Sequence, residues 1–296
     1  MKTQVVSPED LDLAVAFLKS GEPIAFPTET VYGLGAPVFQ EATVKRIFQI
    51  KGRPSDNPLI AHISTLEQAA LIGDDLPASF FLLAQQFWPG PLALVVKRNR
   101  SVPAIVSAGH PTIAIRMPSH RTARRLIDQL GEPLAAPSAN LSGRPSPTSA
   151  LDVLEDLDGK IPLIIDAGPC SIGIESTVLS LVSERLILLR PGSIKKEALE
   201  EALQEKIYLP SPETPAHSPG MKYRHYAPKA KLRLVFDPKD FSGAYVLARV
   251  TQSNLYASLR RADRLGIPEI EIFCDDSVQA DPALMNRLLR ASGHLV

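Results

Sequence analysis

A proline-rich segment divides the sequence into two parts of unequal size. The segment PSPETPAHSPGMKYRHYAPK begins directly after Leu209 and contains few aliphatic side chains. Such a composition favours an extended linker over a packed element. The sequence therefore predicts a large domain at residues 1–208, a linker at residues 209–229 and a small domain at residues 230–296.

Short apolar strands alternate with helical stretches in the large domain. Apolar residues at helical spacing predict helices at residues 11–18, 42–51, 122–130 and 149–157. Strands are predicted at residues 24–26, 59–63, 92–96, 112–116, 134–136, 163–166, 176–182 and 186–190. After the linker, two strands, a helix, a third strand and a second helix follow. This order predicts an α/β fold with a mixed, twisted sheet and a second, smaller Rossmann-like α/β domain.

Composition and charge exclude several classes of protein. The 32 basic residues equal the 32 acidic residues in number, so a role in coating nucleic acid is disfavoured. The two cysteines, far apart in sequence, form no disulfide framework and cannot make a zinc site alone. Residues 76–96 carry no formal charge, but prolines and Gly90 interrupt them, which argues against a membrane span. We expect a cytoplasmic protein with reduced cysteines.

Standard nucleotide-binding and hydrolase motifs are missing. The sequence contains neither GxxxxGK[ST] nor GxGxxG, and neither HExxH nor GxSxG. A nucleotide, if bound, must therefore be held by side chains from scattered elements.

Lys51 and Arg53 lie at the end of a predicted helix. Lys51 continues the helical spacing of the apolar residues before it, which places it on the face turned toward the core. Gly52 and Pro54 end the helix. Two cations on one rigid turn suit a polyphosphate. The alternative is the favourable interaction of a cation with the C-terminus of a helix.

Polar residues also end several predicted strands. Arg116 shares a strand face with Thr112 and requires a partner, either in a structural ion pair or as a clamp for a ligand carboxylate. The same alternation continues through Ala136, Ser138 and Asn140. This segment is either a loop that leads into a helix or a place where the backbone closely approaches a ligand. Ser176 and Arg190 allow the same alternatives. His62 ends an apolar strand, a position more typical of a structural histidine.

Taken together, the motifs resemble a known family. In order they are PTETVYGLGA, KGRPSDNPLIAHI, WPGPLALV, AIRMPSH, APSANLSGRPSPT, GIESTVLSL and LRPGSI. The set closely resembles the YrdC-like threonylcarbamoyl-AMP synthases, whose K-x-R and S-x-N signatures match Lys51-Gly-Arg53 and Ser138-Ala-Asn140. The linker and the second unit resemble the long, two-domain form of that family, although the second unit is shorter here.

The resemblance implies an L-threonylcarbamoyladenylate synthase, which is a nucleotidyltransferase. In this family bicarbonate carboxylates the amine of L-threonine, the carbamate attacks the α-phosphorus of ATP, and pyrophosphate leaves. The product feeds threonylcarbamoyladenosine modification of tRNA through a downstream threonylcarbamoyl transferase complex. Because no enzyme nucleophile is needed, catalysis is expected to rest on positioning and charge. Mg²⁺ is expected to arrive with the phosphates, with Glu29 and Glu175 as weak candidates for protein ligands.

The resemblance also assigns residues to roles. The catalytic signature comprises Lys51, Arg53, Ser138 and Asn140. ATP is expected to contact Lys51, Arg53, Asn57, Thr112, Ser138, Asn140, Ser146, Arg190 and Tyr226. Threonine is expected to contact Thr30, His62, Arg116, Ala136 and Ser176. Residues 217–228 of the linker are a hypothetical lid over ATP; the alternative is a spacer whose tyrosines pack on the first domain.

Two other functions are compatible with parts of the sequence. A related domain could act on another carbamoyl adenylate. An RNA-binding module could use the cations Lys45, Arg46, Lys51 and Arg53 together with residues 121–125. The zero net charge argues against RNA binding as the main role, so we expect at most weak binding.

Overall fold

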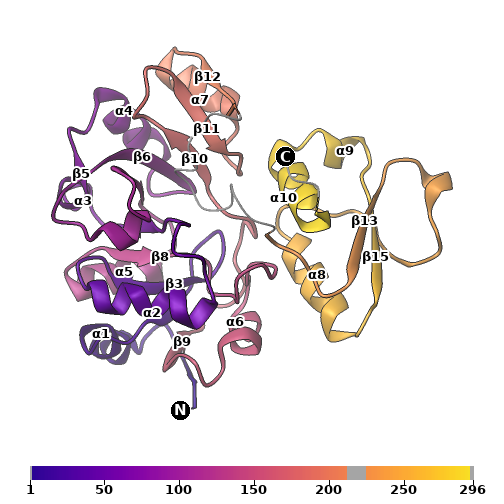
Figure 1. The fold of residues 1–296 in the computed structure, drawn as a ribbon, viewed down its shortest axis with the longest axis horizontal. Helices are drawn as coiled ribbons and strands as arrows, with labels where there is room; N and C mark the ends of the chain where they lie inside the picture. The colour runs from indigo at the N-terminus through magenta and orange to yellow at the C-terminus, as the bar shows by residue number, and fades with distance from the viewer. Residues whose placement is uncertain (1, 212–224, 294–296) are drawn as a thin grey trace.

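The computed structural model describes residues 2–211 and 225–293. Figure 1 shows a large part, coloured indigo to salmon, beside a small part in orange and yellow. The first sheet extends through a strand ending at Tyr208, and the second sheet begins at Lys231. This confirms the predicted α/β class with a second, smaller unit.

The large sheet is mixed. Its strand order is β1-β9-β2-β3-β8-β4-β7-β6-β10-β11-β12, with β5 paired to β6. Neighbours such as β4 and β7 run parallel, whereas β6 and β7 run antiparallel. The strands are β1 Gln4–Val6, β2 Ile24–Phe26, β3 Gly33–Pro37, β4 Ile60–His62, β5 Gly73–Asp74, β6 Leu92–Arg98, β7 Thr112–Arg116, β8 Leu134–Ala136, β9 Leu163–Ile165, β10 Thr177–Ser180, β11 Leu186–Arg190 and β12 Ile207–Tyr208.

Helices pack on this sheet through separate apolar clusters. One cluster joins α1 and α5 to Phe26 and Leu134, and a larger one joins α2, α4 and α6 to other strand residues. The helices are α1 Leu11–Lys19, α2 Glu41–Lys51, α3 Ala69–Ile72, α4 Ala78–Phe87, α5 Arg121–Leu130, α6 Ala150–Leu157 and α7 Lys196–Leu203, with a 3-10 turn η1 at Ala104–Ser107. Within the described residues, no helix combines the length and the apolar character needed to cross a membrane.

The register of three central strands brings predicted site residues together. Ile60 of β4 pairs with Ala136 of β8 on one side and with Ala114 of β7 on the other. Two residues later, His62 pairs with Arg116. Because side chains alternate along a strand, Ile60, His62, Arg116 and Ala136 all face the same side of the sheet.

The small unit contains three parallel strands in the order β13-β15-β14. Its elements are β13 Lys231–Val235, η2 Pro238–Asp240, β14 Tyr245–Leu247, α8 Leu255–Arg264, β15 Glu269–Phe273, α9 Asp276–Gln279 and α10 Pro282–Ser292. A 3-10 turn, η2, is the only helical element between β13 and β14.

Residues 33–37 correct one prediction. No strand was predicted there, but Gly33–Pro37 form β3 and pair with β2 and β8. Gly33 and Gly35 lie over the ring of Phe26, where an added Cβ would come within 3.0 Å and 2.8 Å of it. Close packing against the Phe26 ring therefore requires glycine at both positions. Because these glycines stand where a strand usually has β-branched residues, the sequence pattern did not indicate a strand.

Candidate functional site

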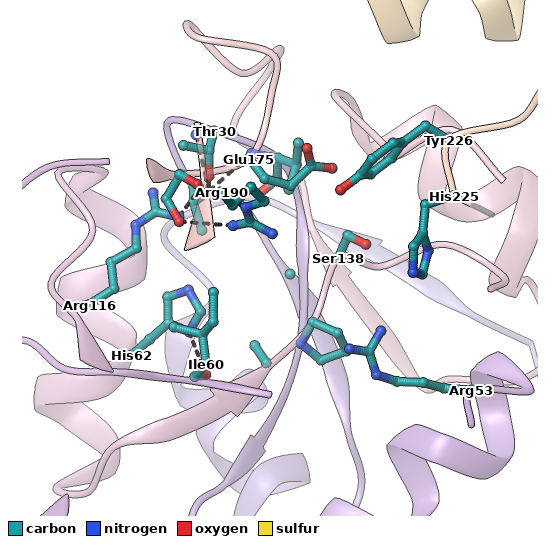
Figure 2. Close-up of a pocket in the computed structure, with 16 residues that line it drawn as sticks. Thr30, Arg53, Ile60, His62, Arg116, Ser138, Glu175, Arg190, His225 and Tyr226 are labelled. Atoms are coloured by element: carbon teal, nitrogen blue, oxygen red, sulfur yellow. Dashed lines mark hydrogen bonds between the residues drawn. The ribbon is translucent and has the colours of Figure 1, made fainter. Parts of the chain in front are cut away.

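A cavity of about 590 Å³, partly open to solvent, lies where the large sheet, the loops that follow its strands and the end of the linker meet. Figure 2 shows Arg116 and His62 on one side of it and Arg53, His225 and Tyr226 on the other. Nine predicted residues line it: Thr30, Arg53, His62, Arg116, Ala136, Ser138, Ser176, Arg190 and Tyr226. The cavity is also lined by five residues without a predicted role: Thr28, Val31, Gly33, Ile60 and Pro137.

Arg116 forms a buried ion pair and also lines the cavity. Its Nη2 lies 2.7 Å from Oε1 of Glu29, and its Nη1 donates to Oγ1 of Thr30 at 2.9 Å. Burial raises the pKa of Glu29, but the charge and hydrogen bond of Arg116 outweigh it and hold the pKa below its ordinary value. The guanidinium is thus a fixed cation at one end of the cavity. Arg116 therefore fits both of the roles considered for it, because it forms an ion pair with Glu29 and also lines a cavity that can receive an anion.

His62 is neutral under physiological conditions. Burial, with the positive charge of Arg116 beside it, lowers the pKa of His62 to about 3. The Nδ1 atom lies 3.1 Å from the carbonyl oxygen of Ile60, and the ring packs edge-on against Phe26. His62 therefore provides an uncharged polar wall beside Arg116.

Two further guanidinium groups line the cavity, those of Arg53 and Arg190. Arg53 donates from Nη2 to Oδ1 of Asn57 at 2.7 Å, and burial lowers the pKa of Arg53 to about 10. Arg190 donates to the carbonyl oxygen of Ser176 at 3.0 Å and to its Oγ at 3.1 Å. Burial likewise lowers the pKa of Arg190. Cations concentrated in one cavity form a site suited to a polyanion.

Lys51 lies behind the cavity wall. Its side chain is 2% exposed, and its Nζ donates to the carbonyl oxygens of Ser138, at 2.5 Å, and Asn140. Burial, together with the charge of Arg53, lowers the pKa of Lys51 well below its ordinary value. The lysine and the S-x-N segment thus meet, but Lys51 holds the loop backbone while Ser138 lines the cavity.

Four more predicted residues lie outside the cavity lining. Asn57 contacts Arg53, Asn140 donates to the carbonyl oxygens of Leu141 and Arg144, and Ser146 donates to Glu175. These three support residues of the wall or its loops. Thr112 and Arg116 share a face of β7 but lie at its opposite ends. Thr112 is therefore not part of the cavity lining.

The end of the linker closes one side of the cavity. The ring of Tyr226 lies 5.5 Å from that of Tyr256, and the backbone nitrogen of Ala227 donates to the carbonyl oxygen of Gly143 at 2.8 Å. Burial lowers the pKa of His225 to about 4 and raises that of Tyr226. Of the hypothetical lid, residues 217–224 lie outside the described residues.

The two acidic residues considered for a metal already have partners. Glu29 pairs with Arg116, and Glu175 accepts hydrogen bonds from Ser146, Tyr256 and Arg287. Among residues 2–211 and 225–293, no group of three or more His, Cys, Asp or Glu side chains is placed to hold a metal ion. The donor set therefore gives no support for a metal site built only of protein ligands.

The proposed RNA-binding surface is partly neutralised. Arg46 forms a two-point pair with Glu22, with both nitrogen–oxygen distances at 2.6 Å. Lys51 is buried and Arg53 lines the cavity. Three of the cations that suggested an RNA surface thus have other partners or other orientations, whereas Lys45 and Arg121 are exposed.

Comparisons with known proteins agree on one family. The Sua5/YciO/YrdC family model, described as "Telomere recombination", matches residues 16–192, and the model of the threonylcarbamoyl-AMP synthase C-terminal domain matches residues 194–251. Threonylcarbamoyl-AMP synthase from Pyrococcus abyssi is 42% identical over 96% of this chain and 94% of its own length. The Bacillus subtilis protein of the same name is 41% identical over 95% of this chain and 92% of its own length. The crystal structure of P. abyssi Sua5 complexed with L-threonine has a TM-score of 0.92 and 39% identity, covering 99% of this chain and 98% of that one.

Proposed function

The chain belongs to the Sua5/YrdC family of threonylcarbamoyl-AMP synthases, and we propose that the cavity around Arg116, Arg53 and Arg190 is where its reaction takes place. The enzyme forms threonylcarbamoyl-AMP and pyrophosphate from L-threonine, bicarbonate and ATP, for the threonylcarbamoyladenosine modification of tRNA. The observation that carries the assignment of the site is the arrangement of charge. Arg116 and Arg53 lie on opposite sides of one cavity, and Arg190 also lines it.

Threonine fits the end of the cavity that contains Arg116. Its carboxylate would approach a guanidinium whose planar fork suits bidentate binding. Thr30 and His62 add a hydroxyl group and a neutral imidazole, which can bind the hydroxyl and amino groups of the substrate without electrostatic repulsion. Ala136 is small and leaves room beside them.

The triphosphate fits the side that contains Arg53 and Arg190. Ser138 presents a hydroxyl group to the same space, and Lys51 holds the loop that carries it. Magnesium would enter bound to the phosphates, because Glu29 and Glu175 already have partners. Bound in this way, the ion would neutralise part of the phosphate charge.

The reaction needs no nucleophile from the protein. The threonine nitrogen attacks the carbon of bicarbonate, and water is lost as the carbamate forms. A carbamate oxygen then attacks the α-phosphorus, and the bond to the bridging oxygen of pyrophosphate breaks. The protein brings the carbamate and phosphate together and stabilises the charge that develops on the oxygens.

Residues 225–228 are the described part of the proposed lid. His225 and Tyr226 line the cavity, and the backbone nitrogen of Ala227 donates to the carbonyl oxygen of Gly143. A lid in this position would limit the access of water to a labile adenylate. We also propose a cytoplasmic location and transfer of the product to a tRNA-modifying complex; weak RNA affinity is a secondary prediction.

Product analysis tests this function directly. Incubation with ATP, L-threonine, bicarbonate and Mg²⁺ should yield the adenylate by mass spectrometry together with one equivalent of pyrophosphate. Omission of threonine or bicarbonate should abolish pyrophosphate release. Equal release without threonine, or with carbamoyl phosphate in its place, would point to the related carbamoyl adenylate activity.

A further inference from the structure

Glu175 places a carboxylate in the wall of a cavity that must accept a triphosphate. It lines the cavity next to Ser176, and its side chain is buried. A buried carboxylate repels a bound polyanion unless a cation neutralises it. The residue that neutralises this charge therefore influences ATP binding.

The ion-pair partner of Glu175 comes from the small domain, as does one of its hydrogen-bond donors. Arg287 of α10 donates from Nε to Oε2 of Glu175 at 2.8 Å, and Tyr256 of α8 donates to the same oxygen at 2.9 Å. Arg287 and Tyr256 are both fully buried. Within the large domain, Ser146 donates to the other carboxylate oxygen.

Arg287 also joins the two segments that hold Arg190. Its Nη2 donates to the carbonyl oxygen of Glu175 at 3.2 Å, and its Nη1 donates to that of Pro191 at 2.8 Å. Glu175 precedes Ser176, the residue to which Arg190 donates, and Pro191 follows Arg190 directly. One side chain of the small domain thus fixes both segments beside a cavity cation.

We propose that Arg287, supported by Tyr256, is a positioning residue for ATP, which neutralises Glu175 and keeps Arg190 available to the phosphates. Without Arg287, the Glu175 carboxylate would lie beside Arg190 and attract its guanidinium. The phosphates would then meet an additional negative charge and lose part of a cationic partner. On this basis the small domain tunes the ATP affinity of a site in the large domain. The inference rests on ATP binding as proposed above.

The test measures ATP affinity of the full-length protein by calorimetry, with and without Mg²⁺. Arg287→Met should weaken ATP binding about tenfold or more, the scale of an added like charge, while threonine affinity changes less than about twofold. Adding Glu175→Gln to that variant should restore most of the lost affinity, because the charge to be neutralised is gone. A purely structural role for Arg287 predicts no such rescue.

Arg260→Met is the matched control. Arg260 is also a fully buried arginine of the small domain at the boundary with the large one, and it donates to Asp156 at 3.0 Å and to the carbonyl oxygen of Pro145 at 2.6 Å. Neither partner lines the cavity. Arg260→Met should therefore change ATP affinity by the same factor with and without Glu175→Gln.

Several outcomes would overturn the proposal. These are unchanged ATP affinity in Arg287→Met, or an equal loss in Arg287→Met and in its double variant. If Arg287→Met fails to fold, two other variants test the proposal. Arg287→Lys should keep ATP affinity within about threefold of the wild type, and Glu175→Gln should bind ATP more tightly than the wild type. Weaker binding by Glu175→Gln, with or without Mg²⁺, would contradict the proposal. A wild-type protein that binds no ATP would instead refute the proposed function.

Discussion

Lys51 donates from its Nζ to the carbonyl oxygen of Ser138 at 2.5 Å, so the two signature segments are joined through a side chain and a backbone oxygen. This contact gives Lys51 a different role from Arg53, although the two residues are nearly adjacent in sequence. Lys51 fixes the shape of the loop, whereas Arg53 faces the cavity.

Lys51→Met should therefore reduce both stability and turnover. Removal of the ammonium group leaves two buried carbonyl groups without this donor, which should lower the free energy of unfolding by about 1–3 kcal/mol. Turnover should fall about a hundredfold as Ser138 moves. Urea denaturation and pyrophosphate release measure the two effects.

Lys19→Met is the control for this experiment, since Lys19 also lies in the last turn of a helix but is exposed. It should change neither quantity appreciably. If Lys51→Met kept wild-type stability and lost only ATP affinity, Lys51 would instead be a direct ligand of phosphate.

Arg116→Lys should separate threonine binding from ATP binding. Lysine keeps the positive charge of Arg116. It cannot contact Glu29 and Thr30 and at the same time bind the threonine carboxylate through two hydrogen bonds. Threonine affinity should fall about tenfold or more, while ATP affinity stays within about twofold. Calorimetry with each ligand measures both, and Arg46→Lys, which alters a pair remote from the cavity, should affect neither. A loss of ATP affinity with unchanged threonine affinity would mean that ATP, and not threonine, binds beside Arg116.

Acid should destabilise the protein partly through His62. Its pKa is lowered to about 3 in the folded protein, whereas an unfolded histidine titrates near 6.5. Between these values the unfolded chain binds a proton that the folded chain excludes. Stability should therefore rise with pH across this window, by up to about 1.4 kcal/mol per pH unit from this residue.

His62→Gln tests the pH effect because glutamine does not titrate in this range. The free energy of unfolding, measured in urea from pH 4 to pH 7, should depend less steeply on pH in this variant. His110→Gln serves as a control for a histidine outside the cavity. An unchanged slope in His62→Gln would mean that His62 is protonated in the folded state.

Tyr226→Ala should increase hydrolysis of the product on the enzyme. The tyrosine ring fills space between the cavity and Tyr256. Its loss should admit water, so the fraction of adenylate recovered as AMP should rise severalfold. Tyr226→Phe retains the ring and should behave like the wild type in this ratio. If all three proteins gave the same ratio, Tyr226 would serve only as packing.

The sequence predicted those parts of the site that lie on regular strands. The strand pattern left the role of Arg116 open and favoured a structural role for His62, and the family resemblance assigned both to threonine. The parallel register places the two residues side by side. Strand β3 was not predicted, because Gly33 and Gly35, which pack against the Phe26 ring, do not give the usual strand pattern. The sequence also could not reveal the partners of Glu175, because Tyr256 and Arg287 follow it by 81 and 112 residues and only the fold brings them together.

Val31 and Ile174 belong to the hydrophobic cluster of the small domain, although both are residues of the large one. The loops that carry Thr30 and Glu175 are therefore covered by side chains of α8 and of the linker, among them Tyr256 and Tyr226. A unit of this size, with three strands, buries little surface and is the weaker of the two. When it melts, the two loops lose their apolar cover while the large sheet is still intact. We therefore expect the smaller sheet, which carries none of the cavity strands, to set the temperature at which heat inactivates the enzyme.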